Sequence, residues 1–237
     1  MSFHEHGDVR IRYEESGDGY PILLIAPGGM RSEGAFWDRM AWNPKELDGY
    51  RVITMDQRNA GQSTGPVSAD DGWHTYLDDQ LGLLDHLGVE ACHVIGMCIG
   101  GPYIAGLLKA APERFASAVI LQPVGIEENR YALEDMFDTW AADIAGDHPH
   151  MSPDDWASFR TNMWGGEFLL TASAEDMADI DTPMLVLMGD DLYHPESTSR
   201  ELVAAAPDAT LIEDWKEGEA LAAADTAIRT FLAENTP

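Results

Sequence analysis

The chain has 237 residues, 45% of them hydrophobic, which is enough to bury the core of one domain. Its 42 acidic residues outnumber the 14 basic ones and give a net charge of −28. Phosphate backbones and anionic lipids require cationic surface, so we expect neither a nucleic acid nor a membrane as a partner. The N-terminal residues lack a basic segment followed by an apolar one, and no apolar run approaches the roughly 20 residues of a membrane span. We therefore expect a cytoplasmic protein.

Short runs rich in Val, Ile or Leu, each ending near Gly, Pro or Asp, predict buried strands along the chain. An alternating stretch at 9–13 predicts an early antiparallel strand, and the residues before it, with His4 and His6, are expected to form a tail. The buried strands are predicted at 21–26, 50–55, 92–95, 116–121, 184–188 and 209–212, and helices at 75–87, 102–110, 196–206 and 218–233. Strands that alternate with helices predict an α/β protein with a mostly parallel sheet covered on both faces.

Residues 126–180 interrupt this alternation. They contain no convincing strand, and their tryptophans and methionines fall at helical spacing. A helical insertion between two strands would lie over the carboxyl edge of the sheet, where ligands bind in open α/β sheets. We therefore expect a single domain, 1–237, with 126–180 as a helical cap or lid. The alternative is an extra packed subdomain with no ligand role.

A glycine-framed cysteine lies between a predicted strand and a predicted helix, in the sequence G-M-C-I-G at 96–100. A turn this tight strains the backbone of its central residue and requires glycines beside it, because a Cβ there would collide with neighbours. It projects the Cys98 side chain above the sheet and directs the Ile99 N–H at the position of a developing oxyanion. The motif predicts a cysteine nucleophile, and a small buried thiol without chemistry is the alternative.

Three further turns each follow a predicted strand. They read I-A-P-G-G-M at 25–30, D-Q-R-N-A-G-Q-S at 56–63 and G-D-D-L-Y-H-P at 189–195. The turn around Cys98 resembles the nucleophile turn of the α/β-hydrolase-fold superfamily. The turns at 25–30, 56–63 and 189–195 resemble, in that order, its oxyanion turn, its D-x-R-G-x-G-x-S turn and its acid-bearing loop. The resemblance covers nearly the whole chain and implies an α/β-hydrolase fold with a short helical lid.

The resemblance also implies roles for individual residues. Cys98 takes the nucleophile position, and the backbone N–H groups of Ile99 and of either Gly29 or Met30 form the oxyanion hole. A thiol in this position suits ester, thioester or lactone chemistry, because a fraction of it is thiolate at neutral pH even without a strong base.

The resemblance assigns the acid and the base less directly. Asp191 takes the role of the acid because it lies four residues before Pro195, and Asp190 is the alternative. The family places a histidine after the last strand, but 195–237 contains none. His194, in the acid loop, is the candidate substitute for this missing base.

Two other histidines, His148 and His150, lie in the expected lid and are further candidates to reach the site. Their H-x-H spacing beside Asp147 makes a metal site conceivable, but the run is short and we predict no metal. No phosphate-cradling loop or nucleotide fingerprint is present, so we predict no cofactor.

Together these features predict an enzyme that hydrolyses a small apolar ester, thioester or lactone through Cys98 and a backbone oxyanion hole. Its partner would be a small-molecule substrate. The absent C-terminal histidine leaves two alternatives open. One is a cofactor-free lyase, isomerase, cyclase or acyltransferase on the same fold. The other is a catalytically inactive homologue that binds a ligand.

Overall fold

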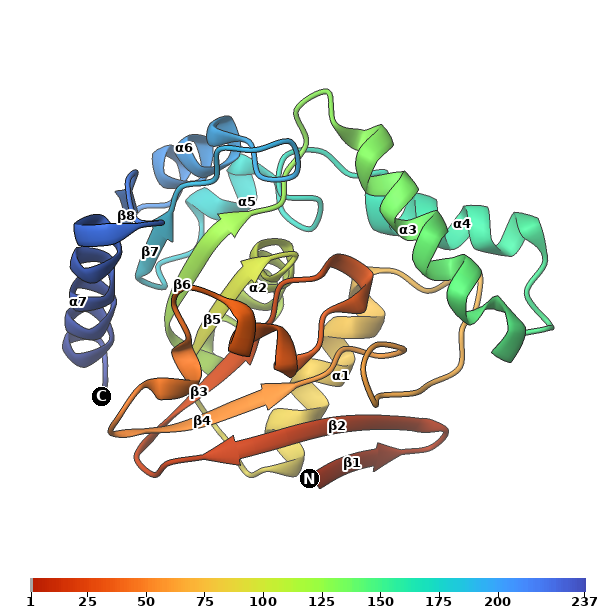
Figure 1. The fold of residues 1–237 in the computed structure, drawn as a ribbon, viewed down its shortest axis with the longest axis horizontal. Coiled ribbons are helices and arrows are strands. Elements are labelled where there is room, and N and C mark those ends of the chain that lie inside the picture. The colour runs from red at the N-terminus through yellow and green to blue at the C-terminus, as the bar shows by residue number, and fades with distance from the viewer. Residues whose placement is uncertain (1) are drawn as a thin grey trace.

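A computed structural model describes residues 2–237, and its centre is an eight-stranded sheet in the order β1-β2-β4-β3-β5-β6-β7-β8 (Figure 1). The pairs β1–β2 and β2–β4 are antiparallel and all other neighbours are parallel. The strands are β1 (Ser2–His6), β2 (Val9–Ser16), β3 (Tyr20–Ile25), β4 (Tyr50–Met55), β5 (Cys92–Cys98), β6 (Phe115–Pro123), β7 (Met184–Leu187) and β8 (Ala209–Ile212). The predicted mostly parallel α/β sheet is confirmed.

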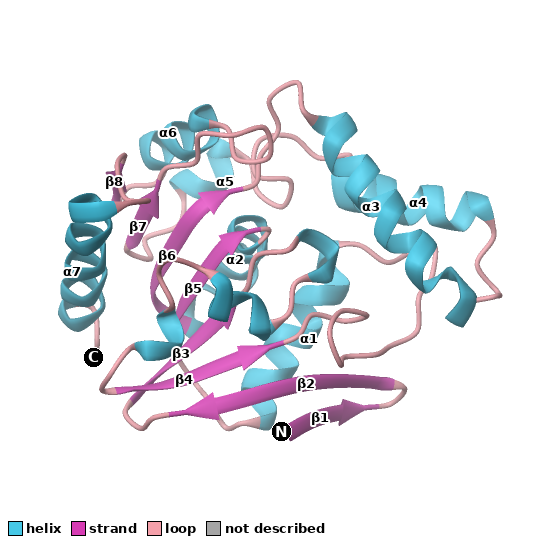
Figure 2. Cartoon of the chain, viewed as in Figure 1, coloured by secondary structure: helices cyan, strands magenta, loops and turns pink. Residues whose placement is uncertain are grey.

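Helices lie on both sides of this sheet (Figure 2). They are α1 (Trp73–His86), α2 (Gly100–Ala110), α3 (Arg130–Ile144), α4 (Pro153–Trp164), α5 (Ala174–Ala178), α6 (Glu196–Ala205) and α7 (Gly218–Glu234). Short 3-10 helices occupy Gly29–Arg31, Gly34–Arg39, Pro44–Glu46, Pro112–Arg114 and Ala145–Asp147. Two apolar clusters result. The larger contains the buried faces of α1 and α2, and the smaller packs α7 and the segment around Trp37 against the opposite face.

The N-terminal residues form a strand, so the expectation of a tail there is wrong. Ser2–His6 pairs along its whole length with β2. The Arg10 guanidinium lies 3.4 Å from the centroid of the Phe3 ring, and the rings of His4 and His86 are 4.6 Å apart. The strand is short and largely polar, so its sequence shows no apolar pattern that would predict it. Contacts with β2 and α1 stabilise it instead.

Residues 126–180 contain α3, α4 and α5 and no strand, as the sequence predicts. Figure 2 shows α3 and α4 side by side, extending beyond the sheet. The Trp140 indole N–H donates to the Asn59 carbonyl (3.1 Å), and Arg31 forms an ion pair with Asp143. These contacts attach α3 to the turns after β4 and β3. That this segment acts as a lid remains a prediction.

A buried histidine connects the end of the chain to the sheet. His93, in β5, is 0% exposed, with Nδ1 2.8 Å from Ser117 Oγ and Nε2 3.0 Å from Thr236 Oγ1. The Thr236 hydroxyl donates to the Leu232 carbonyl (2.8 Å), so its oxygen is left to accept from Nε2–H. Nδ1 then accepts from Ser117. This network holds a neutral imidazole, and burial lowers the pKa of His93 to about 4.

Acid should therefore destabilise the fold through His93. Between pH 6.5 and about 4 the unfolded chain protonates this histidine and the folded one does not. The free energy of unfolding should fall across that window by on the order of 3 kcal/mol. In His93→Gln the amide can accept from Ser117 and donate to Thr236 without titrating, so its loss should be smaller. Urea unfolding of both proteins from pH 7 to 4.5 measures the difference, and parallel losses would contradict the expectation.

Candidate functional site

The turn between β5 and α2 has the strained geometry that the glycine-framed motif predicts. Cys98 has a φ of 61°, in the left-handed region that non-glycine residues rarely adopt. A Cβ on Gly96 would lie 2.8 Å from Ile104 Cδ1, and one on Gly100 would lie 3.0 Å from the Ile25 carbonyl oxygen. Glycine is therefore required on each side of Cys98, and the thiol is held, partly exposed, at the carboxyl end of β5.

Two backbone N–H groups approach the Cys98 sulfur, from Ile99 and from Gly28 in the turn after β3. Gly28 and its neighbour Gly29 have φ values of 120° and 58°, which allow this turn to fold back towards the nucleophile. Gly29 and Met30, the two predicted donors, come next in the turn and are buried. Their role in an oxyanion hole remains a prediction, and the Gly28 N–H is a candidate that the sequence did not indicate.

The acid loop, residues 189–195, carries a hydrogen-bonded aspartate and histidine. His194 Nδ1 lies 2.8 Å from Asp191 Oδ2. Asp191 Oδ1 also accepts from the backbone N–H groups of Tyr193 (2.9 Å) and His194 (3.2 Å). The main chains of Asp191 and His194 exchange two further hydrogen bonds, which close a four-residue turn. This turn orients the imidazole and fixes its Nδ1 towards the carboxylate.

Asp190, the alternative acid, forms an ion pair with Lys216, and the carboxylate that binds His194 is that of Asp191. Neither aspartate caps α6, whose N-cap is Pro195 without a side-chain hydrogen bond. The geometry therefore favours Asp191 as the partner of the histidine.

His194 is buried, with 8% of the residue exposed, and Cys98 is one of the groups that influence its pKa. The Cys98 thiol and the His194 imidazole lie close enough to shift the pKa of each other. The His194 Nε2 atom is buried and forms no hydrogen bond in this structure. Catalytic hydrogen bonds are often long before a substrate is bound, and they tighten in its presence.

The proximity of Cys98 and His194 affects the charge state of both side chains. Burial by itself raises the pKa of Cys98, but His194 and the N–H groups of Gly28 and Ile99 outweigh it, and the pKa is lowered. Burial lowers the pKa of His194, but Cys98 and Asp191 outweigh it, and the pKa is raised. Both shifts favour a thiolate beside an imidazolium, the ionic pair of a reactive cysteine.

The other candidate histidines are engaged elsewhere. The ring of His150 lies 2.8 Å from the Val67 carbonyl through Nε2, and His148 packs at the edges of His150 and Trp156. Within residues 2–237, no group of three or more His, Cys, Asp or Glu side chains is arranged to hold a metal ion.

The segment after β8, where the family's histidine is missing, braces the acid loop. The Trp215 indole N–H donates to the Met188 carbonyl (2.8 Å), and Lys216 pairs with Asp190. Trp215 is buried against the smaller apolar cluster. This segment therefore supports the loop that carries His194 and supplies no base of its own.

Apolar side chains surround the thiol. Cys98 packs against both apolar clusters, and Ile126 and Met136 of the predicted cap pack on the larger one with it. The Met136 thioether occupies the space that a side chain on Gly29 would need. The cap residue Met136 is thus in contact with the oxyanion turn, as expected for a cap that shapes a substrate site.

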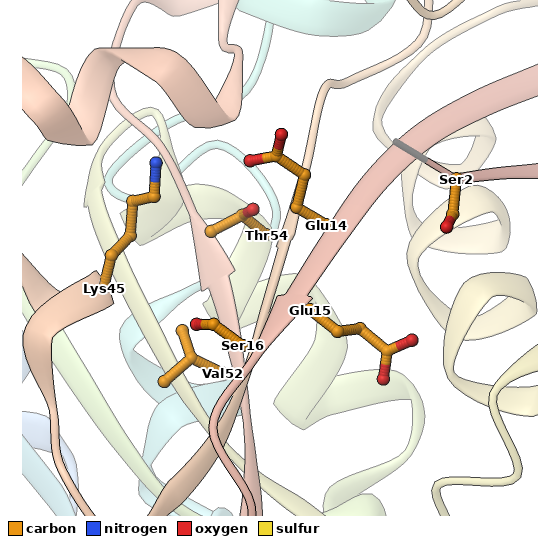
Figure 3. Close-up of a pocket in the computed structure, with 7 residues that line it drawn as sticks. All are labelled: Ser2, Glu14, Glu15, Ser16, Lys45, Val52 and Thr54. Atoms are coloured by element: carbon orange, nitrogen blue, oxygen red, sulfur yellow. The ribbon is translucent and has the colours of Figure 1, made fainter.

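A separate hollow of about 470 Å³ lies on β2 and β4 and includes no residue of the turns described above (Figure 3). Its three charged groups all have ion-pair partners: Glu14 with Arg12, Glu15 with Arg51 and Lys45 with Asp38. It gives no indication of chemistry.

Across residues 2–237, no helix combines the length and apolarity that crossing a membrane requires.

Comparison with known proteins identifies the class. The model of a family described as alpha/beta hydrolase fold matches residues 21–197. The chain belongs to this family, which confirms the fold predicted from its motifs.

Individual relatives are hydrolases. A 2-hydroxy-6-oxo-6-phenylhexa-2,4-dienoate hydrolase of Comamonas testosteroni is 28% identical over 134 residues, covering 56% of this chain and 46% of that protein. The chain therefore matches about half the length of this relative. A meta-cleavage product hydrolase from Pseudomonas fluorescens IP01 superimposes with a TM-score of 0.70 at 21% identity, over 96% of each chain. The enol-lactonase of Burkholderia xenovorans LB400 gives 0.67 at 18% identity, over 99% of each. At these identities, the two structural matches show the fold alone.

Proposed function

We propose that this protein is a cysteine hydrolase that cleaves a small apolar ester, thioester or lactone. The observation that carries the proposal is the hydrogen bond from Asp191 to His194, beside a Cys98 thiol whose pKa the imidazole lowers. In this proposal His194 acts as the base in place of a histidine after β8. The apolar surroundings of Cys98 favour an apolar acyl group, and the hydrolase relatives and the enol-lactonase likeness are consistent with acyl chemistry.

The first half-reaction is acylation. The Cys98 thiolate attacks the substrate carbonyl carbon, and the carbonyl oxygen takes up the negative charge facing the Ile99 N–H and one N–H of the turn at 28–30. The tetrahedral intermediate collapses when His194 donates its proton to the leaving oxygen or sulfur. The products are a thioester on Cys98, a free alcohol or thiol, and a neutral imidazole. A lactone gives a single open-chain acyl group instead.

The second half-reaction is hydrolysis of the thioester. Neutral His194 accepts a proton from water, and the hydroxyl oxygen attacks the thioester carbonyl. Collapse expels the Cys98 thiolate and releases the carboxylic acid, which loses its proton to solvent. The imidazolium that remains restores the starting pair. Asp191 stabilises the imidazolium in both halves and stays ionised throughout.

Trapping the intermediate tests this scheme. With p-nitrophenyl esters of short apolar acids, we expect a burst of p-nitrophenol followed by slower turnover, because deacylation requires a second proton transfer. Intact-mass spectrometry of samples quenched in acid should show one added acyl group, and peptide mapping should place it on Cys98. Steady turnover with neither burst nor adduct, even after rapid quenching, would count against a covalent thioester.

A further inference from the structure

A buried asparagine outside the catalytic groups connects the predicted cap to the acid loop. Asn129 lies at the start of α3 and is 1% exposed. Its amide nitrogen donates to the Gly125 carbonyl (2.9 Å) and to the Leu192 carbonyl (2.8 Å), and its oxygen accepts from the Glu127 N–H (2.9 Å). Both N–H groups and the carbonyl are therefore engaged. One side chain thus holds together the segment after β6 and the loop after β7, which Figure 1 places side by side.

These bonds form a short path between the nucleophile and the base. The N–H of the residue before Gly125 donates to the Cys98 carbonyl (3.0 Å). Gly125 then binds Asn129, Asn129 binds Leu192, and Leu192 is two residues from His194 within the closed turn. The backbone of the nucleophile and the backbone of the base are thereby linked through one amide side chain.

Strained backbone marks the same segment. Gln122 and Glu128 have φ values of 37° and 53°, and Cys98 beside them has 61°. Non-glycine residues in this region cost roughly 1–3 kcal/mol each and persist only where the surroundings impose them. The bond from Glu127 N–H to Asn129 is one such constraint, since it spans Glu128.

We propose that Asn129 is a positioning residue that sets the distance from His194 to Cys98, an inference that rests on the proposed function. In the usual arrangement, acid and base come from different loops. Here Asp191 and His194 share one turn, so a shift of the turn at Leu192 moves both relative to the thiol. A misplacement of about 1 Å can reduce a rate by roughly 10²-fold.

Two substitutions test the role of Asn129. Asn129→Ala removes all three hydrogen bonds. Asn129→Asp keeps the shape and the acceptor for Glu127 but places an oxygen where the donor to Gly125 and Leu192 was. A control is Asn235→Ala, because Asn235 also donates from its amide to a backbone carbonyl, that of Phe231 (2.8 Å), at the end of α7 and outside the predicted cap and the acid loop.

We expect kcat on p-nitrophenyl esters to fall about 10–100-fold in both Asn129 variants, with KM changed by less than about 3-fold. The pH midpoint for alkylation of Cys98 by iodoacetamide should rise, because His194 is one of the groups that lower its pKa. Asn235→Ala should change neither quantity. Circular dichroism and thermal unfolding establish that each variant is folded.

The outcomes separate this inference from the proposed function. If Cys98→Ala removes activity while both Asn129 variants keep the original kcat and alkylation midpoint, Asn129 does not position the base. If both variants fail to fold, Asn129 is required for the fold as a whole, and the specific positioning role is rejected. If Cys98→Ala leaves activity intact, the proposed function is wrong, and the alkylation midpoints still decide whether Asn129 holds His194.

Discussion

Replacing His194 by alanine should reduce kcat for an apolar ester by on the order of 10⁶-fold, the size of effect seen when an acyl-transfer triad loses its base. The imidazole is needed twice, to protonate the leaving group and to activate water. It also lowers the pKa of Cys98, so without it burial raises that pKa and depletes the thiolate at neutral pH. Steady-state kinetics at pH 7 give the rate effect.

The pH dependence of alkylation separates the two contributions of His194. At pH 7 the reaction of Cys98 with iodoacetamide should slow in His194→Ala, and near pH 10 the two rates should converge. The other cysteine does not interfere, because Cys92 is 0% exposed and burial raises its pKa to about 12. Asp38→Asn is the control: it breaks the ion pair with Lys45, outside the acid loop, and should leave both profiles close to those of the unmodified protein. A His194→Ala protein with normal turnover would exclude it as the base.

Replacing Cys98 by alanine should abolish ester turnover, with a loss on the order of 10⁶-fold, because no covalent intermediate can form. The substitution removes one sulfur atom from a partly exposed position, so the fold should be retained. Alkylation by iodoacetamide should disappear with the activity.

Cys98→Ser distinguishes covalent catalysis from the alternative of a cofactor-free lyase, isomerase or cyclase. Serine with the Asp191–His194 pair retains a nucleophile and a base, but the site favours a thiolate beside an imidazolium, a charge state that a hydroxyl does not reach. We expect activity well below that of the cysteine protein and above that of Cys98→Ala. An almost unchanged rate in Cys98→Ser would instead support non-covalent polarisation of a carbonyl.

The inactive-homologue alternative is tested by the same measurements. It rested on the absence of a histidine after β8. His194 is buried, hydrogen-bonded to Asp191 and near enough to Cys98 to influence its pKa, so a histidine is present at the site. Trp215 and Lys216, in the segment after β8, contact the loop that carries His194.

The parts of the site that depend on local geometry could be predicted from the sequence. The spacing of glycines around Cys98 requires one strained turn, and the positive φ of Cys98 follows from it. Apolar runs in alternation with helical patterns predicted the sheet and most of its helices, because burial on both faces imposes continuous apolar strands. Asp191 was preferred to Asp190 from its spacing to Pro195, and it is the one that contacts His194.

Other features depend on contacts between segments far apart in the chain, and these only the tertiary structure decided. A histidine three residues after an aspartate in a loop is ordinarily a surface residue. Here it is buried within the closed turn at Asp191, and this turn accepts a hydrogen bond at Leu192 from Asn129, 63 residues before Leu192 in the chain. In the same way, β1 exists because β2 offers it a pairing edge. The sequence determined which groups could react. Packing of distant segments decided which of them meet, because hydrogen-bond distances between loops depend on the whole sheet that carries them.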